Sequence, residues 1–320
     1  MRELRIGLLG CGTVGSGFVH LLDRDRRRIG DRYGVDVRVA KILVRDPAKC
    51  RAGVDPSLLT SSAVEVIDGR CDVVVEVMGG VHSAGAFVRR ALSLGRDVVT
   101  ANKALLAEKG RELFAAAEDR RLFLRFEASV CAGVPIVRAL QSGLAGDTID
   151  SVAGVLNGTC NFILTRMEQG LSLAEAATEA QRSGFAEEDL STDIDGIDAA
   201  HKIAILAQLA FSERVRKTSV LGIRHLTSEE VVRAKNAGQA IRLIAEASRV
   251  PGGVEIRVEP RTIARSDPFV TSYESNVVII RGRSVGEVLL AGKGAGAMPT
   301  AAAVLSDVLE IARLRAGGGA

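Results

Sequence analysis

A glycine-rich turn near the start of the chain constrains the fold most. Residues Gly10–Gly15 read GCGTVG and match the pattern G-x-G-x-x-G. They follow Leu4–Gly10, an apolar run typical of a buried strand, and they precede a helical pattern of apolar residues. Here Gly10 permits a tight turn, Gly12 lets a pyrophosphate approach the backbone, and Gly15 allows helix and strand to pack closely. The turn therefore predicts a dinucleotide-binding βαβ unit.

Strands and helices alternate over roughly residues 1–135. Helices are expected after Gly15 and at Phe87–Leu94 and Leu105–Arg120. Strands are expected at Leu4–Gly10, Val35–Val44, Asp72–Met78, Asp97–Thr100 and Leu122–Glu127. This alternation predicts an α/β fold with a Rossmann-type, doubly wound parallel sheet that has helices on both faces.

The alternation is lost in the rest of the chain. Strands are expected at Ser151–Leu156, Val254–Val258 and Asn276–Gly282, and helices at Leu171–Ser183, Asp198–Phe211 and Pro299–Arg315. This pattern predicts a second, α+β domain. We place the first domain at residues 1–135, with 292–320 returning to it, and the second at 136–291.

The composition excludes several classes of protein. With 47% hydrophobic and 25% charged residues, the chain is neither disordered, collagen-like nor a coiled coil. No apolar stretch approaches the roughly 20 residues of a membrane helix. Dispersed basic residues and only 3% aromatics argue against a nucleic-acid platform. Five scattered cysteines without a CxxC pair and the absence of a leader predict reduced thiols and a cytoplasmic location.

The end of the second expected strand bears on the choice of nucleotide. Arg45 occupies the position where an arginine favours the 2′-phosphate of NADP. Asp46 follows directly, and an acidic residue there favours the ribose hydroxyl of NAD. NADP is therefore favoured, while NAD stays open.

Two lysines stand out, because lysine supplies only 8 of the 42 basic residues. Lys103 follows a short strand at the sheet edge where ligands bind, although a plain surface lysine would also fit. Asp198 and Lys202 share a helix face if that helix begins near Gly196, which is also the pattern of an ordinary exposed ion pair. The acidic run around them would suit a substrate that carries both an ammonium group and a hydroxyl or carbonyl.

Two further loops could contact a ligand. Asn157–Thr159 could offer backbone N–H groups and a hydroxyl to a carboxylate. The glycine-rich loop Gly292–Thr300 leads into a helix and permits close backbone approach. Each is equally compatible with a simple turn at a helix start.

Several segments in their order along the chain resemble the homoserine dehydrogenase family. The most diagnostic is GFAEEDLSTDIDGIDAAHK at 184–202. The others are GCGTVG at 10–15, VEVMGG at 75–80, TANKALLA at 100–107, EASVCAGVP at 127–135, LNGTCNFIL at 156–164 and GKGAGAMPTAAAVL at 292–305.

The resemblance implies the NAD(P)-dependent interconversion of L-homoserine and L-aspartate 4-semialdehyde, in threonine, methionine and isoleucine biosynthesis. It makes Lys103 and Lys202 the catalytic lysines, and Asp198 a residue that orients Lys202 and binds substrate or water. The substrate would be bound by Glu187 and Asp193, which hold its ammonium group, and by Gly158 and Thr159. The second domain would bind the substrate and pair with its twin in a homodimer.

The resemblance also implies the remaining ligand sites. The cofactor site would comprise Gly10, Gly12, Thr13, Val14, Gly15, Arg45, Gly79, Thr100, Lys103, Gly294 and Gly296. A monovalent cation, sodium or potassium, would be held by Glu127 and by the backbone oxygens of Val130, Ala132 and Val134.

The sequence departs from the family pattern at two positions. Cys131 stands where the family has a glycine or another small residue, and Lys293 replaces a proline. Many members continue into a regulatory domain that senses amino acids, so we expect a short form that L-threonine does not inhibit.

Two alternative functions remain at this point. An enzyme like aspartate-semialdehyde dehydrogenase would need a nucleophilic cysteine, for which Cys131 and Cys160 are the candidates. A non-catalytic NAD(P)-binding regulator would keep the glycine turn but would have no reason to retain Lys103, Asp198 and Lys202 together.

Overall fold

The computed structural model describes residues 2–184, 189–271 and 275–316. The chain forms two compact units. The first unit comprises Met1–Gly133 and Gly296–Ala320, and the second comprises Val134–Ala295. These bounds lie within four residues of the boundaries predicted from the sequence. The functions assigned to the two domains stay predictions.

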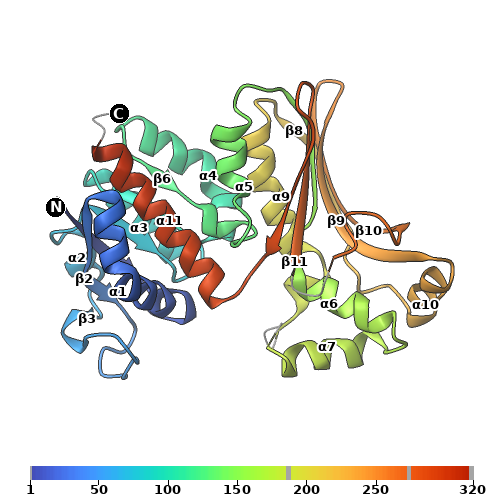
Figure 1. Cartoon of the computed structure of the whole chain (residues 1–320), viewed down its shortest axis with the longest axis horizontal. Helices are drawn as coiled ribbons and strands as arrows, with labels where there is room; N and C mark the ends of the chain where they lie inside the picture. The colour runs from blue at the N-terminus through green and yellow to red at the C-terminus, as the bar shows by residue number, and fades with distance from the viewer. Residues whose placement is uncertain (1, 185–188, 272–274, 317–320) are drawn as a thin grey trace. The chain divides into compact units, whose positions relative to one another are not determined.

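The first unit is built on a six-stranded parallel sheet with the order β3-β2-β1-β4-β5-β6. Figure 1 labels β2, β3 and β6 of this sheet. Its strands are β1 (Arg2–Leu9), β2 (Val35–Leu43), β3 (Leu59–Thr60), β4 (Val73–Glu76), β5 (Asp97–Thr100) and β6 (Leu124–Arg125). The strand order reverses beside β1, which has β2 on one side and β4 on the other. In open α/β sheets, ligands bind at the carboxyl ends of the strands at such a reversal.

Helices cover both faces of this sheet. One core joins the strands to α1 (Thr13–Tyr33) and α11 (Ala297–Ala316), while the other joins them to α2 (Ala63–Ile67), α3 (His82–Ser93) and α4 (Lys103–Glu118). Successive residues of β4 alternate between the two cores. Because both faces are buried, the strand is continuously apolar rather than alternating. The predicted doubly wound α/β fold is confirmed.

The glycine turn has the geometry that its pattern predicts. Gly10 has a φ of +103°, which favours glycine. A Cβ on Gly15 would lie 2.2 Å from the carbonyl oxygen of Gly10, so only glycine fits there. A Cβ on Gly12 would meet nothing within 4 Å, which leaves the backbone at this position open to a ligand.

The second unit is built on a mixed sheet with the order β12-β11-β7-β9-β10-β8. Its strands are β7 (Ile149–Val155), β8 (Val215–Val220), β9 (Gln239–Val250), β10 (Gly253–Ala264), β11 (Ser275–Gly282) and β12 (Gly286–Lys293). All neighbours pair antiparallel except β8 and β10, which are parallel. The α+β prediction is confirmed, although the sequence alone predicted no strand at β8, β9 or β12.

Helix α9 lies against β7, β9 and β10, and it carries Lys202. The helices of this unit are α5 (Ile136–Arg138), α6 (Gly158–Met167), α7 (Leu173–Arg182), α8 (Ser191–Ile194), α9 (Ile197–Ala210) and α10 (Ser228–Asn236). Shorter helical turns are η1 (Pro56–Leu58) and η2 (Glu127–Ser129) in the first unit and η3 (Ala139–Gly143) in the second. None of the helices in the described residues is long and apolar enough to cross a membrane.

The glycine turn provides a matched pair of substitutions. We expect Gly15→Ala to lower the free energy of unfolding by more than about 1 kcal/mol, because its methyl group collides with a backbone oxygen. Gly12→Ala should stay within about 0.5 kcal/mol of the wild type, because its backbone is extended and its surroundings are open. Urea denaturation measures both. Equal stability of the two variants would contradict this account of the turn.

Candidate active site

A buried carboxylate organises the carboxyl edge of the parallel sheet. Glu76, the last residue of β4, is 0% exposed. Its Oε2 accepts a hydrogen bond of 2.6 Å from Thr100 at the end of β5. Its Oε1 accepts the backbone N–H groups of Met78 (2.9 Å) and Gly79 (3.1 Å). Glu76, which the sequence analysis did not select, therefore shapes the loop that contains Gly79.

Asn102 extends this network to the helix that carries Lys103. Its side-chain amide donates to the Gly80 carbonyl (2.6 Å), and its own backbone N–H donates to Thr100 Oγ1 (3.1 Å). Its Oδ1 accepts the backbone N–H of Leu105 (3.1 Å) and so caps α4. Lys103 is the first residue of α4, so these bonds fix its backbone at the sheet edge.

Arg45 lies two residues beyond the end of β2 and is exposed. Asp46 is partly committed to its own loop, because its Oδ1 accepts the backbone N–H of Ala48 (2.9 Å). Arg51 supports the same loop by donating to the backbone carbonyls of Asp46 (3.1 Å) and Lys49 (2.8 Å). The loop thus presents Arg45 to solvent at the end of β2, the strand next to β1.

The second predicted lysine lies in the second unit and is buried. The Nζ of Lys202 donates to the carbonyl oxygen of Leu156 (2.6 Å) and pairs with Asp198 Oδ2 at 2.8 Å. Lys202 is 8% exposed and Asp198 is 5% exposed. The helix begins directly after Gly196, as the sequence predicted, which places Asp198 and Lys202 on one face. The pair is therefore not an ordinary surface ion pair.

Asn157 joins this pair to a third predicted residue. Its amide donates to Asp193 Oδ1 (2.6 Å) and to Asp198 Oδ2 (2.9 Å). Its Oδ1 accepts the backbone N–H of Cys160 (2.7 Å), so Asn157 also caps α6, which begins with Gly158 and Thr159. The sequence signals only the cap, because asparagine is a common N-cap residue. The bridge between the two aspartates joins residues far apart in the chain and has no local signal.

Two other acids of this run, Asp195 and Asp189, have separate partners. Arg224 donates to both carboxylate oxygens of Asp195 (2.7 and 2.9 Å), which lowers the pKa of Asp195. Asp189 accepts the backbone N–H of Ser191 (2.9 Å). Glu187 lies outside the described residues, so its predicted role stays a prediction.

Cys160 has the surroundings of an inert thiol. It is 0% exposed, and its Sγ donates to the carbonyl oxygen of Asp193 at 3.1 Å. Burial and the negative charges of Asp193 and Asp198 raise the pKa of the Cys160 thiol well above its usual range. A nucleophilic cysteine needs the thiolate, so this side chain does not suit acyl transfer.

The segment predicted to hold a cation is buried and tied down. Glu127 lies in η2 rather than in the predicted strand, is 4% exposed, and donates its backbone N–H to Asp307 Oδ2 (2.9 Å). Cys131 has a φ of +49°, a conformation that glycine adopts without strain. Val130 and Ala132 belong to the first unit, and Val134 opens the second.

The two predicted glycines of the loop at 292–300, Gly294 and Gly296, have different local roles. A Cβ on Gly294 would lie 1.6 Å from Asn276 Oδ1, so side-chain packing accounts for this glycine. Gly296 has a φ of +118° and directly precedes α11. Lys293 ends β12 and is exposed.

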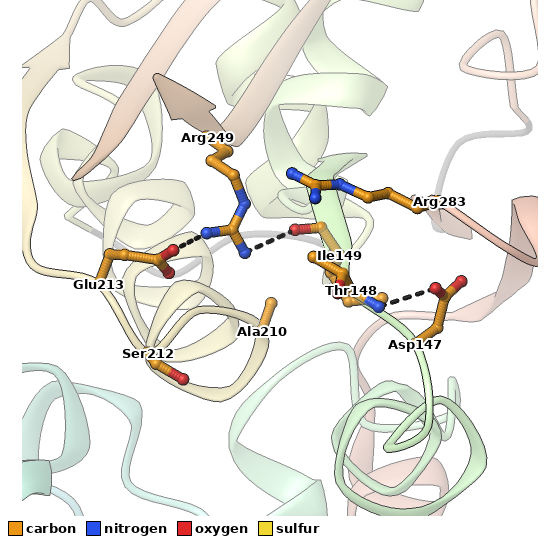
Figure 2. Close-up of a pocket in the computed structure, with 8 residues that line it drawn as sticks. All are labelled: Asp147, Thr148, Ile149, Ala210, Ser212, Glu213, Arg249 and Arg283. Carbon is orange, nitrogen blue, oxygen red and sulfur yellow. Dashed lines mark hydrogen bonds and ion pairs between the residues drawn. The ribbon is translucent and has the colours of Figure 1, made fainter. Parts of the chain in front are cut away.

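A polar cavity of about 600 Å³ in the second unit lies apart from the predicted residues (Figure 2). Its charged side chains have partners inside and outside the cavity: Arg249 pairs with Glu213 and donates to the Ile149 carbonyl, and Arg283 pairs with Asp150 (3.0 Å). Asp147 accepts the backbone N–H of Thr148 (2.7 Å). None of the described residues that line this cavity is a predicted site residue.

The fold and the site define a class of protein. A doubly wound sheet with an open glycine turn at its strand-order reversal is the architecture of a dinucleotide-binding enzyme. The second unit adds a buried lysine–carboxylate cluster, which can bind and protonate a small polar substrate.

The comparisons with known proteins give the family. The family "Homoserine dehydrogenase" matches residues 135–309, and "Homoserine dehydrogenase, NAD binding domain" matches residues 10–127. The homoserine dehydrogenase of Bacillus subtilis (strain 168) is 41% identical over 317 residues, which cover 97% of this chain and 73% of that protein. This chain belongs to the homoserine dehydrogenase family.

Solved structures agree. A homoserine dehydrogenase from Thiobacillus denitrificans superposes with a TM-score of 0.95 at 40% identity, over 99% of this chain and 75% of that one. A hyperthermophilic archaeal homoserine dehydrogenase in complex with NADPH superposes with a TM-score of 0.83 at 29% identity, over 97% of each chain.

The burial of Cys160 leads to a test by alkylation. At pH 7.5 in the native protein, we expect iodoacetamide to label the exposed Cys50 and to leave Cys160 unmodified. Peptide mass spectrometry measures both sites, and labelling in urea serves as the control that Cys160 is detectable. Rapid native labelling of Cys160 would revive a thiolate mechanism.

Proposed function

We propose that Lys202 and Lys103 serve the reaction of this family in this chain, the interconversion of L-aspartate 4-semialdehyde and L-homoserine. The buried residues Lys202, Asp198 and Asn157, together with the half-buried Asp193 that Asn157 contacts, are the observation that supports it most. Reduction adds a hydride to the aldehyde carbon and a proton to its oxygen. The nicotinamide, when bound, supplies the hydride.

Lys202 is suited to donate the proton. Its ammonium group is held by two acceptors, the carboxylate of Asp198 and the carbonyl of Leu156, which favour the charged side chain and fix its direction. General acid catalysis of this kind is worth about 10²–10⁴-fold in rate. In the oxidation, Lys202 takes the proton back from the hydroxyl. Lys103 is the second lysine that we assign to the same oxygen.

Other residues would hold the charged groups of the substrate. Asp193, fixed by Asn157, and Glu187 would bind the ammonium group. Gly158 and Thr159 open α6, and the N–H groups of a helix N-terminus favour a carboxylate. The substrate would therefore be fixed by both charged groups on its α-carbon, and its aldehyde would be left for the lysines.

The first unit fits a nicotinamide dinucleotide. The open backbone at Gly12 and the α1 N-terminus, where Gly12 makes no side-chain capping bond, suit a pyrophosphate. Thr13, Val14 and Gly15 would continue this turn, while Gly79 and Thr100 would line the site. Gly294 and Gly296 would complete it. We propose NADP(H), because Arg45 is exposed while Asp46 is engaged in its own loop.

We also propose a monovalent cation, sodium or potassium. The donors are the Glu127 carboxylate and the backbone oxygens of Val130, Ala132 and Val134. An all-oxygen set suits a hard cation, and the described residues contain no His, Cys, Asp and Glu cluster of the kind that binds a transition metal.

The remaining proposals concern assembly and location. The edge strands of the second unit expose large apolar side chains, including Val220 (41%) and Leu289 (45%), which a second copy would cover in a homodimer. Strands β7 and β11, in the interior of the same sheet, are already buried in one chain. All five cysteines are free, which fits a cytoplasmic enzyme of threonine, methionine and isoleucine biosynthesis.

Consumption of NADPH with L-aspartate 4-semialdehyde in phosphate-free buffer tests the activity. We expect Lys103→Ala and Lys202→Ala each to lower kcat by at least about 100-fold, because each removes a proton donor. Binding of NADPH to Lys202→Ala should stay within about threefold of the wild type, a change of less than 1 kcal/mol. Lys217→Ala, at a lysine whose side chain is 71% exposed, is the control. Near-normal turnover of either variant would remove that lysine from the mechanism.

The preference for NADPH over NADH tests the proposed role of Arg45. Arg45→Ala should weaken NADPH binding by about 1.5–3 kcal/mol, roughly 10- to 100-fold, because it removes a charge-assisted hydrogen bond. Binding of NADH should change little. Fluorescence titration measures both, with the exposed Arg27→Ala as the control. Equal losses for the two nucleotides would show that Arg45 does not bind the 2′-phosphate.

A further inference from the structure

A second cluster of charges lies at the opposite end of α6 from Asn157. Glu168 ends this helix and is 5% exposed. Arg242 donates to its Oε1 (2.7 Å), and Arg265 donates to its Oε2 (2.8 Å). Lys235 donates to its backbone carbonyl (2.9 Å). Both carboxylate oxygens of Glu168 are thus already engaged by arginines.

These residues line a cavity of about 360 Å³. Its described lining residues carry three positive charges and a single negative charge, so two of these positive charges are not balanced by a described lining residue. The cavity in Figure 2 differs, because its two arginines stand with two carboxylates, Asp147 and Glu213. The remaining lining residues are Thr165, Gln169, Val270 and Thr271.

Arg242 makes the imbalance significant. It is 2% exposed, and burying a charge is unfavourable unless partners compensate it. Its Nη1 is bonded to Glu168 and to the Ile241 carbonyl (2.8 Å), but its Nε is buried and has no partner among the described residues. A buried guanidinium that shares one carboxylate with a second arginine still has donor capacity for an anion.

We propose that this cavity is a binding site for a small dianion of the phosphate class. Two unbalanced positive charges match a dianion, and guanidinium groups bind phosphate oxygens with directed, charge-assisted hydrogen bonds. Arg265, with its side chain 40% exposed, and the exposed Lys235 form the open side of the site. Arg242 forms its buried wall. The volume is of the size that holds a small ligand.

Thermal unfolding with inorganic phosphate at constant ionic strength tests the site. We expect a saturable rise in Tm for the wild type, because a ligand that binds only the folded state stabilises it. Lys235→Gln and Arg265→Gln should each shift the midpoint of this rise at least tenfold to higher phosphate. Arg257→Gln, at an exposed arginine outside the cavity, should leave it unchanged.

Two further arms distinguish this cavity from the nucleotide site and phosphate from a dicarboxylate. Phosphate could also bind at the nucleotide site, so the rise in Tm must be retained in Arg45→Ala. Loss of the rise in Arg45→Ala, or an unchanged rise in Arg265→Gln, overturns the proposal. Succinate replaces phosphate in a parallel titration, and stabilisation by succinate alone would refute the phosphate class. If Arg265→Gln is unfolded in the absence of ligand, Lys235→Gln is the variant that tests the site, because this substitution leaves the buried Arg242–Glu168 pair intact. The absence of any saturable rise in the wild type also overturns the proposal.

Discussion

The second unit depends on how the ammonium group of Lys202 is held. A buried charge is tolerated only when its partners replace the water that it loses. Here they come from three places: the end of β7 supplies the Leu156 carbonyl, α9 supplies Asp198, and Asn157 holds Asp198 in turn. The end of β7 and the helices α6 and α9 must therefore meet in one arrangement, and that arrangement defines the candidate site.

The first unit also buries an ionisable side chain, in this case a carboxylate. Glu76 is wholly buried at the end of β4, and its oxygens accept hydrogen bonds from Thr100 and from two backbone N–H groups. Asn102 continues the chain of bonds to α4. Satisfied buried networks of this kind are rigid. The loop after β4 and the start of the helix with Lys103 are thereby fixed beside the glycine turn.

Local patterns predicted much of this structure. The glycine turn, the doubly wound sheet and the start of α9 after Gly196 were predictable, because each depends on residues close together in the sequence. Strand β9 was not, because it carries Arg242, a charge that only its pairing with Glu168 from α6 makes compatible with burial. Strand β12, at the edge of its sheet, was not predicted either, because its residues are exposed or half-buried and form no fully buried apolar face.

The site contacts that the sequence did not reveal join distant residues in the same way. Asn157 bonds to residues 36 and 41 positions away, and Glu76 to Thr100, 24 positions away. No short pattern encodes such contacts. The reverse holds for the acidic run, where sequence proximity suggested that many carboxylates act together. Asp195 instead pairs with Arg224, while Asp193 and Asp198 share Asn157.

The most direct test of the central claim compares Asn157→Ser with the wild type in homoserine oxidation. Serine retains the cap on α6 but loses the amide that bridges Asp193 and Asp198. Urea denaturation should show a folded variant that loses about 1.5–3 kcal/mol of stability, the size of a hydrogen bond to a charged group. The account predicts that kcat falls and KM for homoserine rises, each at least tenfold, while KM for the nucleotide stays unchanged. Wild-type kinetics in the folded variant would contradict it.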